Sequence, residues 1–152
     1  VKVLFLFVIF TSIVSLCLTV QAHEGAKGVI KQRMVAMKTM ASSMKSLHAI
    51  ATGKSIFDVE KVKLNTSTIR NEGGAKLLKL FPQGSLGYPS EAKPEIWEDL
   101  PAYVNLVADL SQKVNEMDSA LSTAEPRVEF YIAFKNLARV CSNCHKRFRA
   151  KK

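Results

Sequence analysis

The chain has 152 residues, of which 47% are hydrophobic and 23% charged, and its formal net charge is +9. This length allows one domain with one core and excludes two ordinary domains. A basic surface of this kind can steer anionic partners or lie against acidic lipid.

An apolar run over residues 3–20 is followed by Ala22, with small residues at the positions that a signal peptidase reads. The run predicts a cleaved signal peptide over residues 1–22 and a mature domain over 23–152. The alternative is an uncleaved membrane anchor, because the run approaches the length of a bilayer span. The exported protein is expected in the bacterial periplasm. Nucleic acid is not expected as a partner there.

The first predicted helix covers residues 25–52 and ends at Gly53, which suits a C-terminal cap. Arg33 lies on its inward face, where burying a guanidinium without a partner is costly. Either an anionic group lies beside Arg33, or its stem covers the core edge while its head reaches water. Methionines at helical spacing usually fill a core. The predicted inward face is Val29, Arg33, Met37, Met40, Met44, Leu47 and Ala51.

The second predicted helix starts with Asp58 as its N-cap and ends at Phe81-Pro82. Residues 65–68 are poor helix formers, and Gly73-Gly74 is expected to bend or loosen the helix. Residues 83–93 are predicted to form an irregular connection between two halves of a bundle. The inward residues are expected to be Val59, Val62, Ile69, Leu77 and Leu80.

The third predicted helix is interrupted by Pro101, so a short turn over residues 94–99 is expected before a main helix capped by Asp99. Its expected core residues are Ile96, Trp97, Leu100, Tyr103, Val104, Val107, Leu110, Val114, Met117 and Leu121.

The fourth predicted helix starts between Thr123 and Pro126. No stretch alternates with the period of a strand, and four helices with short outer connections predict an all-α, antiparallel four-helix bundle. The residues expected on nearly one face of the fourth helix are Val128, Tyr131, Phe134, Leu137, Cys141, Cys144 and Phe148.

The motif Cys141-Ser142-Asn143-Cys144-His145 predicts covalent attachment of one c-type haem. Cysteines at i and i+3 project from one side of a helix, so both thiols can form thioethers with one porphyrin. His145 is then the proximal ligand of the iron. A thioredoxin-like pair needs a strand–helix context and a zinc site needs four ligands, and the sequence offers neither. The two propionates of the haem can supply the anion that Arg33 needs.

The sequence resembles the cytochrome c′ family, in which one haem is attached near the end of a four-helix bundle, over essentially the whole mature chain. Pro101 departs from the family pattern at the start of the third helix. Besides the haem motif, the residues that carry the resemblance are Arg33 and Met37, Gly53-Lys54 with Phe57-Asp58, Lys93-Pro94-Glu95-Ile96-Trp97, and Phe148-Arg149.

The resemblance implies roles for individual residues. Members with an empty sixth coordination site typically have an apolar residue at the position of Met37, whereas Met37 is similar to the low-spin cytochrome c-556 type, whose iron is held by His and Met. By the same resemblance, Arg33 pairs with a haem propionate and Arg149 lies near the ring of His145. The resemblance also implies a homodimer through the outer helices.

These observations predict a periplasmic carrier of single electrons with a six-coordinate His145/Met37 haem and a redox partner that is anionic. The alternative is a haem protein that binds nitric oxide or carbon monoxide at a labile sixth site, for sensing or detoxification. No base lies beside a nucleophile in the sequence, so an enzymatic activity is not expected. No membrane span is expected after signal cleavage.

Overall fold

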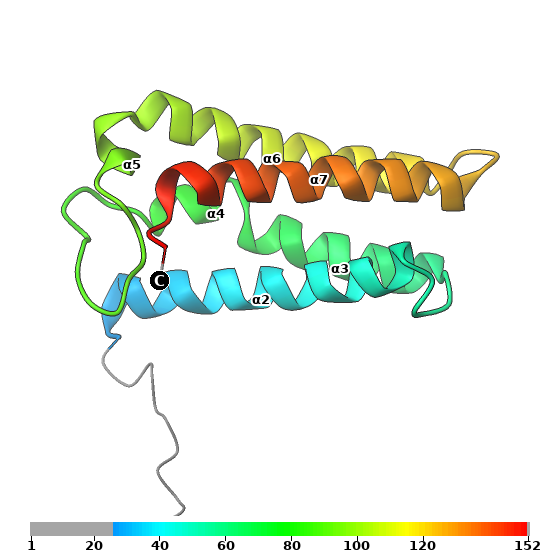
Figure 1. Cartoon of the computed structure of the whole chain (residues 1–152), viewed down its shortest axis with the longest axis horizontal. Helices are drawn as coiled ribbons and strands as arrows, with labels where there is room; N and C mark the ends of the chain where they lie inside the picture. The colour runs from blue at the N-terminus through cyan, green and yellow to red at the C-terminus, as the bar shows by residue number, and fades with distance from the viewer. Residues whose placement is uncertain (1–25, 152) are drawn as a thin grey trace, which may run out of the picture.

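The computed structural model describes residues 26–151, and these form an antiparallel four-helix bundle (Figure 1). The predicted signal peptide and the residue at which the mature chain was expected to begin lie outside this part. The all-α fold class is confirmed. Within residues 26–151, no helix is long and apolar enough to cross a membrane. The helices are α2 (Gly28–Ala51), α3 (Val59–Glu72), α4 (Gly74–Lys79), α5 (Glu95–Glu98), α6 (Leu100–Ala120) and α7 (Pro126–Phe148).

Local chemistry determines where the helices begin and end. The Asp58 carboxylate accepts hydrogen bonds from the backbone N–H groups of Glu60 and Lys61, at 2.9 and 3.1 Å, and so caps α3 as predicted. Asp99 caps α6 in the same way and accepts from the N–H of Ala102. Pro101 therefore falls in the first turn of α6, where a missing N–H costs no helical hydrogen bond. The expected short turn before this helix is α5.

The long second helix that the sequence predicts is divided in two at the glycine pair. Helix α3 ends at Glu72, and α4 starts at Gly74 with φ +52°, a conformation that glycine adopts without strain. Residues 65–68 are helical despite their low propensity. The amide of Asn65 and the hydroxyls of Ser67 and Thr68 donate to backbone carbonyl groups three or four residues earlier. These polar groups are satisfied along the helix itself.

The core is rotated slightly from the predicted helix faces. Leu100, Val104, Val128 and Tyr131 were expected in the core, but they are 38–53% exposed, so these predictions were wrong. The apolar stripe was assigned from large side chains, whereas small residues allow the helix backbones to approach closely. The buried residues that the predicted faces omitted include Ala36, Ser43, Ile50, Thr66, Ala120, Phe130, Ala133 and Val140.

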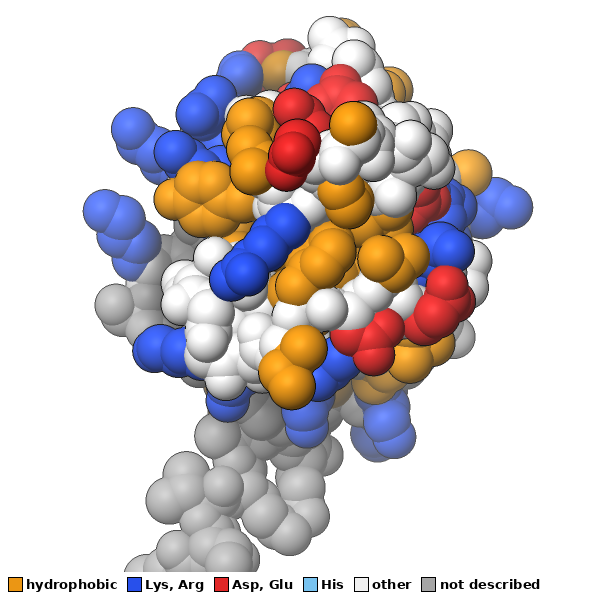
Figure 2. Space-filling view, turned by 90° about the vertical axis from the view of Figure 1, so that its right-hand side faces the viewer, with side chains coloured by type: hydrophobic (Ala, Val, Ile, Leu, Met, Phe, Trp, Pro, Cys, Tyr) orange, Lys and Arg blue, Asp and Glu red, His pale blue; other side chains and the backbone are white. Residues whose placement is uncertain are grey.

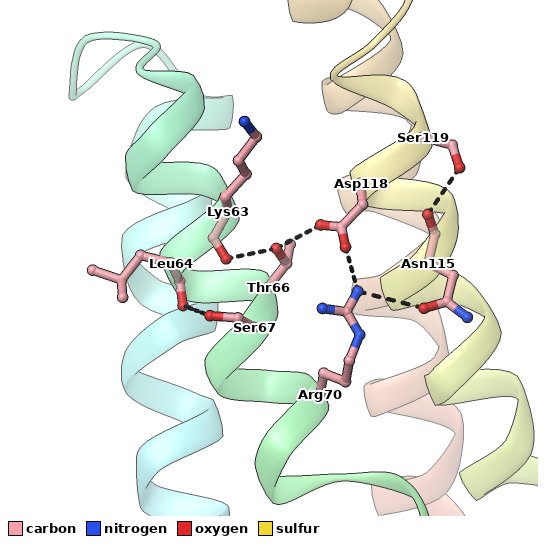
Figure 3. Close-up of polar contacts among 8 residues, drawn as sticks. All are labelled: Lys63, Leu64, Thr66, Ser67, Arg70, Asn115, Asp118 and Ser119. Atoms are coloured by element: carbon pink, nitrogen blue, oxygen red, sulfur yellow. Dashed lines mark hydrogen bonds and ion pairs between the residues drawn. The ribbon is translucent and has the colours of Figure 1, made fainter.

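A polar network joins α3 to the C-terminal part of α6 (Figure 3). The fully buried hydroxyl of Thr66 lies 2.8 Å from Asp118 Oδ1 and 3.0 Å from the carbonyl oxygen of Lys63. Arg70 donates to the other carboxylate oxygen of Asp118 and, at 3.4 Å, to the side chain of Asn115. One carboxylate thus contacts a buried hydroxyl and a guanidinium from two turns of α3, which fixes the register of the two helices.

Replacing Asp118 with alanine is expected to lower the free energy of unfolding by about 1–2 kcal/mol, mainly because the buried Thr66 hydroxyl loses an acceptor. The partly exposed ion pair with Arg70 contributes less. Urea unfolding of the holo-protein, followed by circular dichroism, measures the change. Asp109→Ala on the same helix is the control, and equal losses in the two variants would show that the network does not stabilise the bundle.

Candidate haem site

The motif that was predicted to bind haem lies in the last two turns of α7. Cys141 and Cys144 form no disulfide, are half-buried and pack against the hydrophobic core. Burial raises the pKa of both thiols, that of Cys144 to about 11. Because the thiolate is the form that binds metals and attacks disulfides, these cysteines are poorly suited to a redox pair. An uncharged thioether suits the same apolar setting.

Backbone hydrogen bonds join the end of α7 to the long connection that precedes α5. The N–H of Lys93 donates to the carbonyl of Phe148 at 3.0 Å, and the N–H of Ala150 donates to that of Glu91 at 2.8 Å. Arg149 Nε donates to Glu91 Oε2 at 2.6 Å. Arg147 also pairs with Asp99, the cap of α6. The end of α7 that carries the cysteines is therefore fixed to the long connection and to α6.

Arg33 is buried, and its head does not reach water. The side chain is 3% exposed, Nη2 donates to the carbonyl of Ser85 at 2.7 Å, and the guanidinium lies 4.6 Å from the centre of the Phe81 ring. Its Nε has no hydrogen-bond partner, and none of the ion pairs among residues 26–151 includes Arg33. Burial lowers the pKa of Arg33. The described part of the protein thus leaves this cation without a carboxylate partner.

Tyr103 adds a second buried polar group that sequence reasoning assigned only to the core. The residue is 2% exposed and its hydroxyl has no partner. Its ring packs on Phe81 and Phe148, with centroids 5.2 and 5.5 Å away. Burial, followed by the charge of Cys144, raises the pKa of Tyr103, whereas the charge of Arg33 opposes the rise. A tyrosine among core residues was itself a signal, because a buried phenol normally needs a partner.

Met37 and His145 lie at the same level of the bundle. Helices α2 and α7 run in opposite directions side by side (Figure 1), and the rings of His48 and Phe134 meet between them with centroids 6.0 Å apart. Met37 is eleven residues before His48, and His145 is eleven residues after Phe134. Eleven residues are about three helical turns, or roughly 16 Å. Both residues therefore lie on the sides of α2 and α7 that face each other at His48 and Phe134, at matching heights, with Met37 half-buried and His145 exposed.

The other candidates on α2 differ in their surroundings. Met40 is buried in the core, and Met34 and Met44 are half-buried like Met37. Partial desolvation, followed by the positive charge of Arg149, lowers the pKa of His145, and Glu91 opposes this. The imidazole is thereby favoured in its neutral form, which is the form that binds metals.

These residues fit a haem on physical grounds. Arg33 Nε and the Tyr103 hydroxyl are buried donors without partners, and both side chains contact Phe81. Each influences the pKa of the other, and Tyr103 also senses Cys144. Among residues 26–151 no carboxylate bonds to either of these two donors, and propionate groups are acceptors of the kind that they need. The cysteines at the same end could supply the covalent attachment.

A family profile described as Cytochrome C′ matches residues 28–149. The chain belongs to the cytochrome c′ family. Proteins of this family carry a covalently bound c-type haem, so this protein is a c-type haem protein. The fold and the cofactor that the sequence predicted are therefore both confirmed.

Relatives within the family have two kinds of name. The chain is 33% identical over 127 residues to cytochrome c-556 of Agrobacterium fabrum, with 84% of each chain covered. It is 31% identical over 125 residues to cytochrome c′ of Rhodopseudomonas palustris, covering 82% of this chain and 83% of that one. Cytochrome c prime from Shewanella frigidimarina has the same fold, with a TM-score of 0.73, 20% identity, and 81% and 94% of the two chains covered.

Tyr103 is expected to stay neutral in alkaline solution for as long as the protein is folded. Its pKa in the folded protein lies above the unfolded value of about 10, so its neutral form contributes stability below that pH. This stability is lost as the pH rises beyond it. Ultraviolet difference spectra of the holo-protein should show that Tyr103 ionises only when the protein unfolds.

The variant Tyr103→Phe should remove this ionisation and move alkaline unfolding to higher pH. Tyr131→Phe is the control, since Tyr131 is 46% exposed and its hydroxyl should not affect the unfolding pH. A reversible ionisation of Tyr103 in the folded protein would contradict its buried position.

Proposed function

We propose that this protein carries single electrons in the periplasm through a haem whose iron is bound by His145 and Met37. Cys141 and Cys144 form the thioethers in this proposal. The observation that carries it is the register of α2 and α7, which brings a methionine of the first helix and the histidine of the haem motif to one level of one interface. The cytochrome c-556 name of several relatives supports the same reading.

The haem, when bound, supplies an iron that alternates between the ferrous and ferric states. The chain holds the two axial ligands on helices that pack against each other. A thioether ligand such as Met37 raises the reduction potential. Since both ligands are strong, no position stays open for a substrate, and the proposal assigns no catalytic step to this protein.

Arg33 and Arg149 are proposed to serve the haem rather than the fold alone. Arg33 and the Tyr103 hydroxyl donate to a propionate, which satisfies the two buried groups that lack partners. The positive charge of Arg149, held by Glu91, acts on His145 and favours its neutral form. These contacts orient the cofactor and influence its potential.

A second candidate is the binding of nitric oxide or carbon monoxide after displacement of Met37. Relatives named cytochrome c′ favour it, and one solved structure of the same fold is a nitric oxide complex of a variant of cytochrome c prime from Alcaligenes xylosoxidans. In this reading the half-buried Met37 is a labile ligand or no ligand. The protein then senses or removes the gas.

The protein is proposed to be exported to the periplasm and to exchange electrons there with another protein. Residues 1–22 act as a cleaved signal peptide, and residues 23–152 form the periplasmic haem domain. The partner in electron transfer is a redox protein, and the homodimer implied by the resemblance stays a prediction.

Met37→Ala is expected to open the sixth coordination site. The visible spectrum of the reduced variant should change from sharp low-spin bands to broad high-spin bands, and carbon monoxide should shift it. The wild type should ignore the gas. Met44→Ala is the matched control, because Met44 is also half-buried on α2 and lies two turns further from the start of the helix.

A wild-type spectrum that is already high-spin and shifts with carbon monoxide would favour the gas-binding candidate. If the low-spin spectrum were kept in Met37→Ala and lost in Met44→Ala, the sixth ligand would be Met44 and not Met37.

N-terminal sequencing of the exported holo-protein is expected to begin at His23. A signal peptidase cleaves after a small residue, and Ala22 is in that position. Replacing Ala22 with a bulky residue, Ala22→Phe, should block cleavage and leave the protein in the membrane fraction. Wild-type protein that keeps residues 1–22 would instead support the membrane anchor.

A further inference from the structure

Charge is divided unequally between the two halves of the bundle. Helix α2 has four cationic residues and no acid in 24 residues, and α7 has five cationic residues and one acid, Glu129. Together these two helices carry a net charge of +8, whereas α3 and α6 together carry −1. The basic character of the whole chain therefore comes from the half that contains the proposed axial ligands.

The cations of this half form a defined surface, which we call the α2–α7 basic face. Lys31, Lys38 and Lys45 recur every seven residues on α2, which is about two turns, so they lie on one side of that helix. All members are exposed, and none belongs to an ion pair among residues 26–151. The face consists of Lys31, Lys38, Lys45, Lys135, Arg139 and Lys146.

The arrangement is visible in the figures. Helices α2 and α7 lie nearest the viewer in Figure 1, and this side is turned to the left in Figure 2. There, Lys and Arg side chains gather along the left side, while the right side carries Asp and Glu side chains among its cations. The cations of the basic face repel one another, and within residues 26–151 no ion pair neutralises any of them. A surface of this kind is complementary to an acidic one.

The basic face surrounds the level of the proposed haem ligands. Lys38 follows Met37 in the sequence, and Lys146 follows His145. By the register that His48 and Phe134 define, Lys38 and Lys146 come from opposite helices at nearly the same height. A partner held by these cations therefore approaches the protein where the cofactor is attached.

We propose that the α2–α7 basic face is the docking surface for an acidic redox protein, an inference that rests on the proposed electron-carrier function. A protein partner is favoured over an anionic membrane by the state of the apolar faces. Helices that lie on membranes insert an apolar face into the lipid boundary. The core-facing sides of α2 and α7 are buried, through residues such as Ala36, Leu47 and Leu137. The exposed apolar side chains of α7 (Val128, Tyr131 and Ile132) lie in its first two turns, at the end away from the haem motif, and on α2 Val35 is exposed as a single residue.

The test measures how charge affects oxidation of the reduced holo-protein. One electron passes from the ferrous protein, which becomes ferric, to hexacyanoferrate(III), which becomes hexacyanoferrate(II). Stopped-flow rates with this trianion should fall roughly tenfold as the ionic strength rises from about 0.01 to about 0.5 M, because salt screens the attraction. The cationic oxidant tris(phenanthroline)cobalt(III) should show the opposite trend.

Two double variants locate the effect. Lys38→Glu/Lys146→Glu reverses charge on the basic face, and Lys54→Glu/Lys61→Glu makes the same net change on exposed lysines of the α2–α3 turn and of α3. At low salt, the first variant should react with hexacyanoferrate(III) roughly threefold more slowly than the second, or slower still. The two rates should converge at high salt. Equal rates at low salt, or a wild-type rate that ignores salt, would overturn the proposal.

Macromolecular probes decide between partner classes. Poly-L-glutamate should inhibit the reaction of the wild type with hexacyanoferrate(III) and spare the variant of the basic face. Sedimentation with vesicles that contain phosphatidylglycerol, at physiological salt, tests the membrane alternative. If the wild type bound the vesicles and the same variant did not, the partner of the basic face would be an anionic membrane and not a protein. A high-spin spectrum that shifts with carbon monoxide would reject the electron-carrier function but not the docking surface, because the salt dependence is measured independently of the sixth ligand.

Discussion

The packing of α2 against α7 is the contact on which the haem site depends. These helices are the first and last of the described bundle, so residues more than a hundred positions apart in the sequence come together only when the whole fold has formed. The contact between His48 and Phe134 sets their register, and the register brings Met37 level with His145. A slip of one turn along either helix, about 5.4 Å, would separate the two. The network around Asp118 holds α3 and α6 in register, and these helices pack in turn against α2 and α7.

A buried cation at the same end of the bundle explains why the site is made for an anionic cofactor. Arg33 would be costly in an apolar core without an opposite charge, and replacing it by a well-packed apolar residue would then stabilise the polypeptide. The backbone carbonyl of Ser85 and the face of Phe81 compensate only part of this cost. The unpaired phenol of Tyr103 adds to it. Two unsatisfied donors that share one neighbour are reasonable only if a ligand completes them.

The helix ends and the haem motif could be predicted from the sequence. The rotation of the core and the partner of Arg33 could not, for physical reasons. Asp58, Asp99 and the pair Gly73-Gly74 act on their own neighbours, so local rules located the helix ends and the break. The haem motif is equally local, because its two cysteines are one turn apart. The rotation of the core was missed because Ala36, Thr66 and Ala133 are buried by close helix approach, which depends on partners distant in sequence. The partner of Arg33 could not be predicted either, since the Ser85 carbonyl belongs to an irregular segment 52 residues away.

The balance between an electron carrier and a gas-binding protein depends on how firmly the fold holds one thioether. An electron carrier benefits when the iron keeps both ligands in both oxidation states, because little rearrangement then accompanies the transfer. In this bundle each ligand is proposed to come from a separate long helix, and those helices also carry the basic face. An acidic partner docked on that face would contact both helices and oppose their separation. Displacement of Met37 by a gas would favour the separation. Charge on the surface and coordination at the iron would thus be coupled through the same pair of helices, and an acidic partner bound there would select the six-coordinate state.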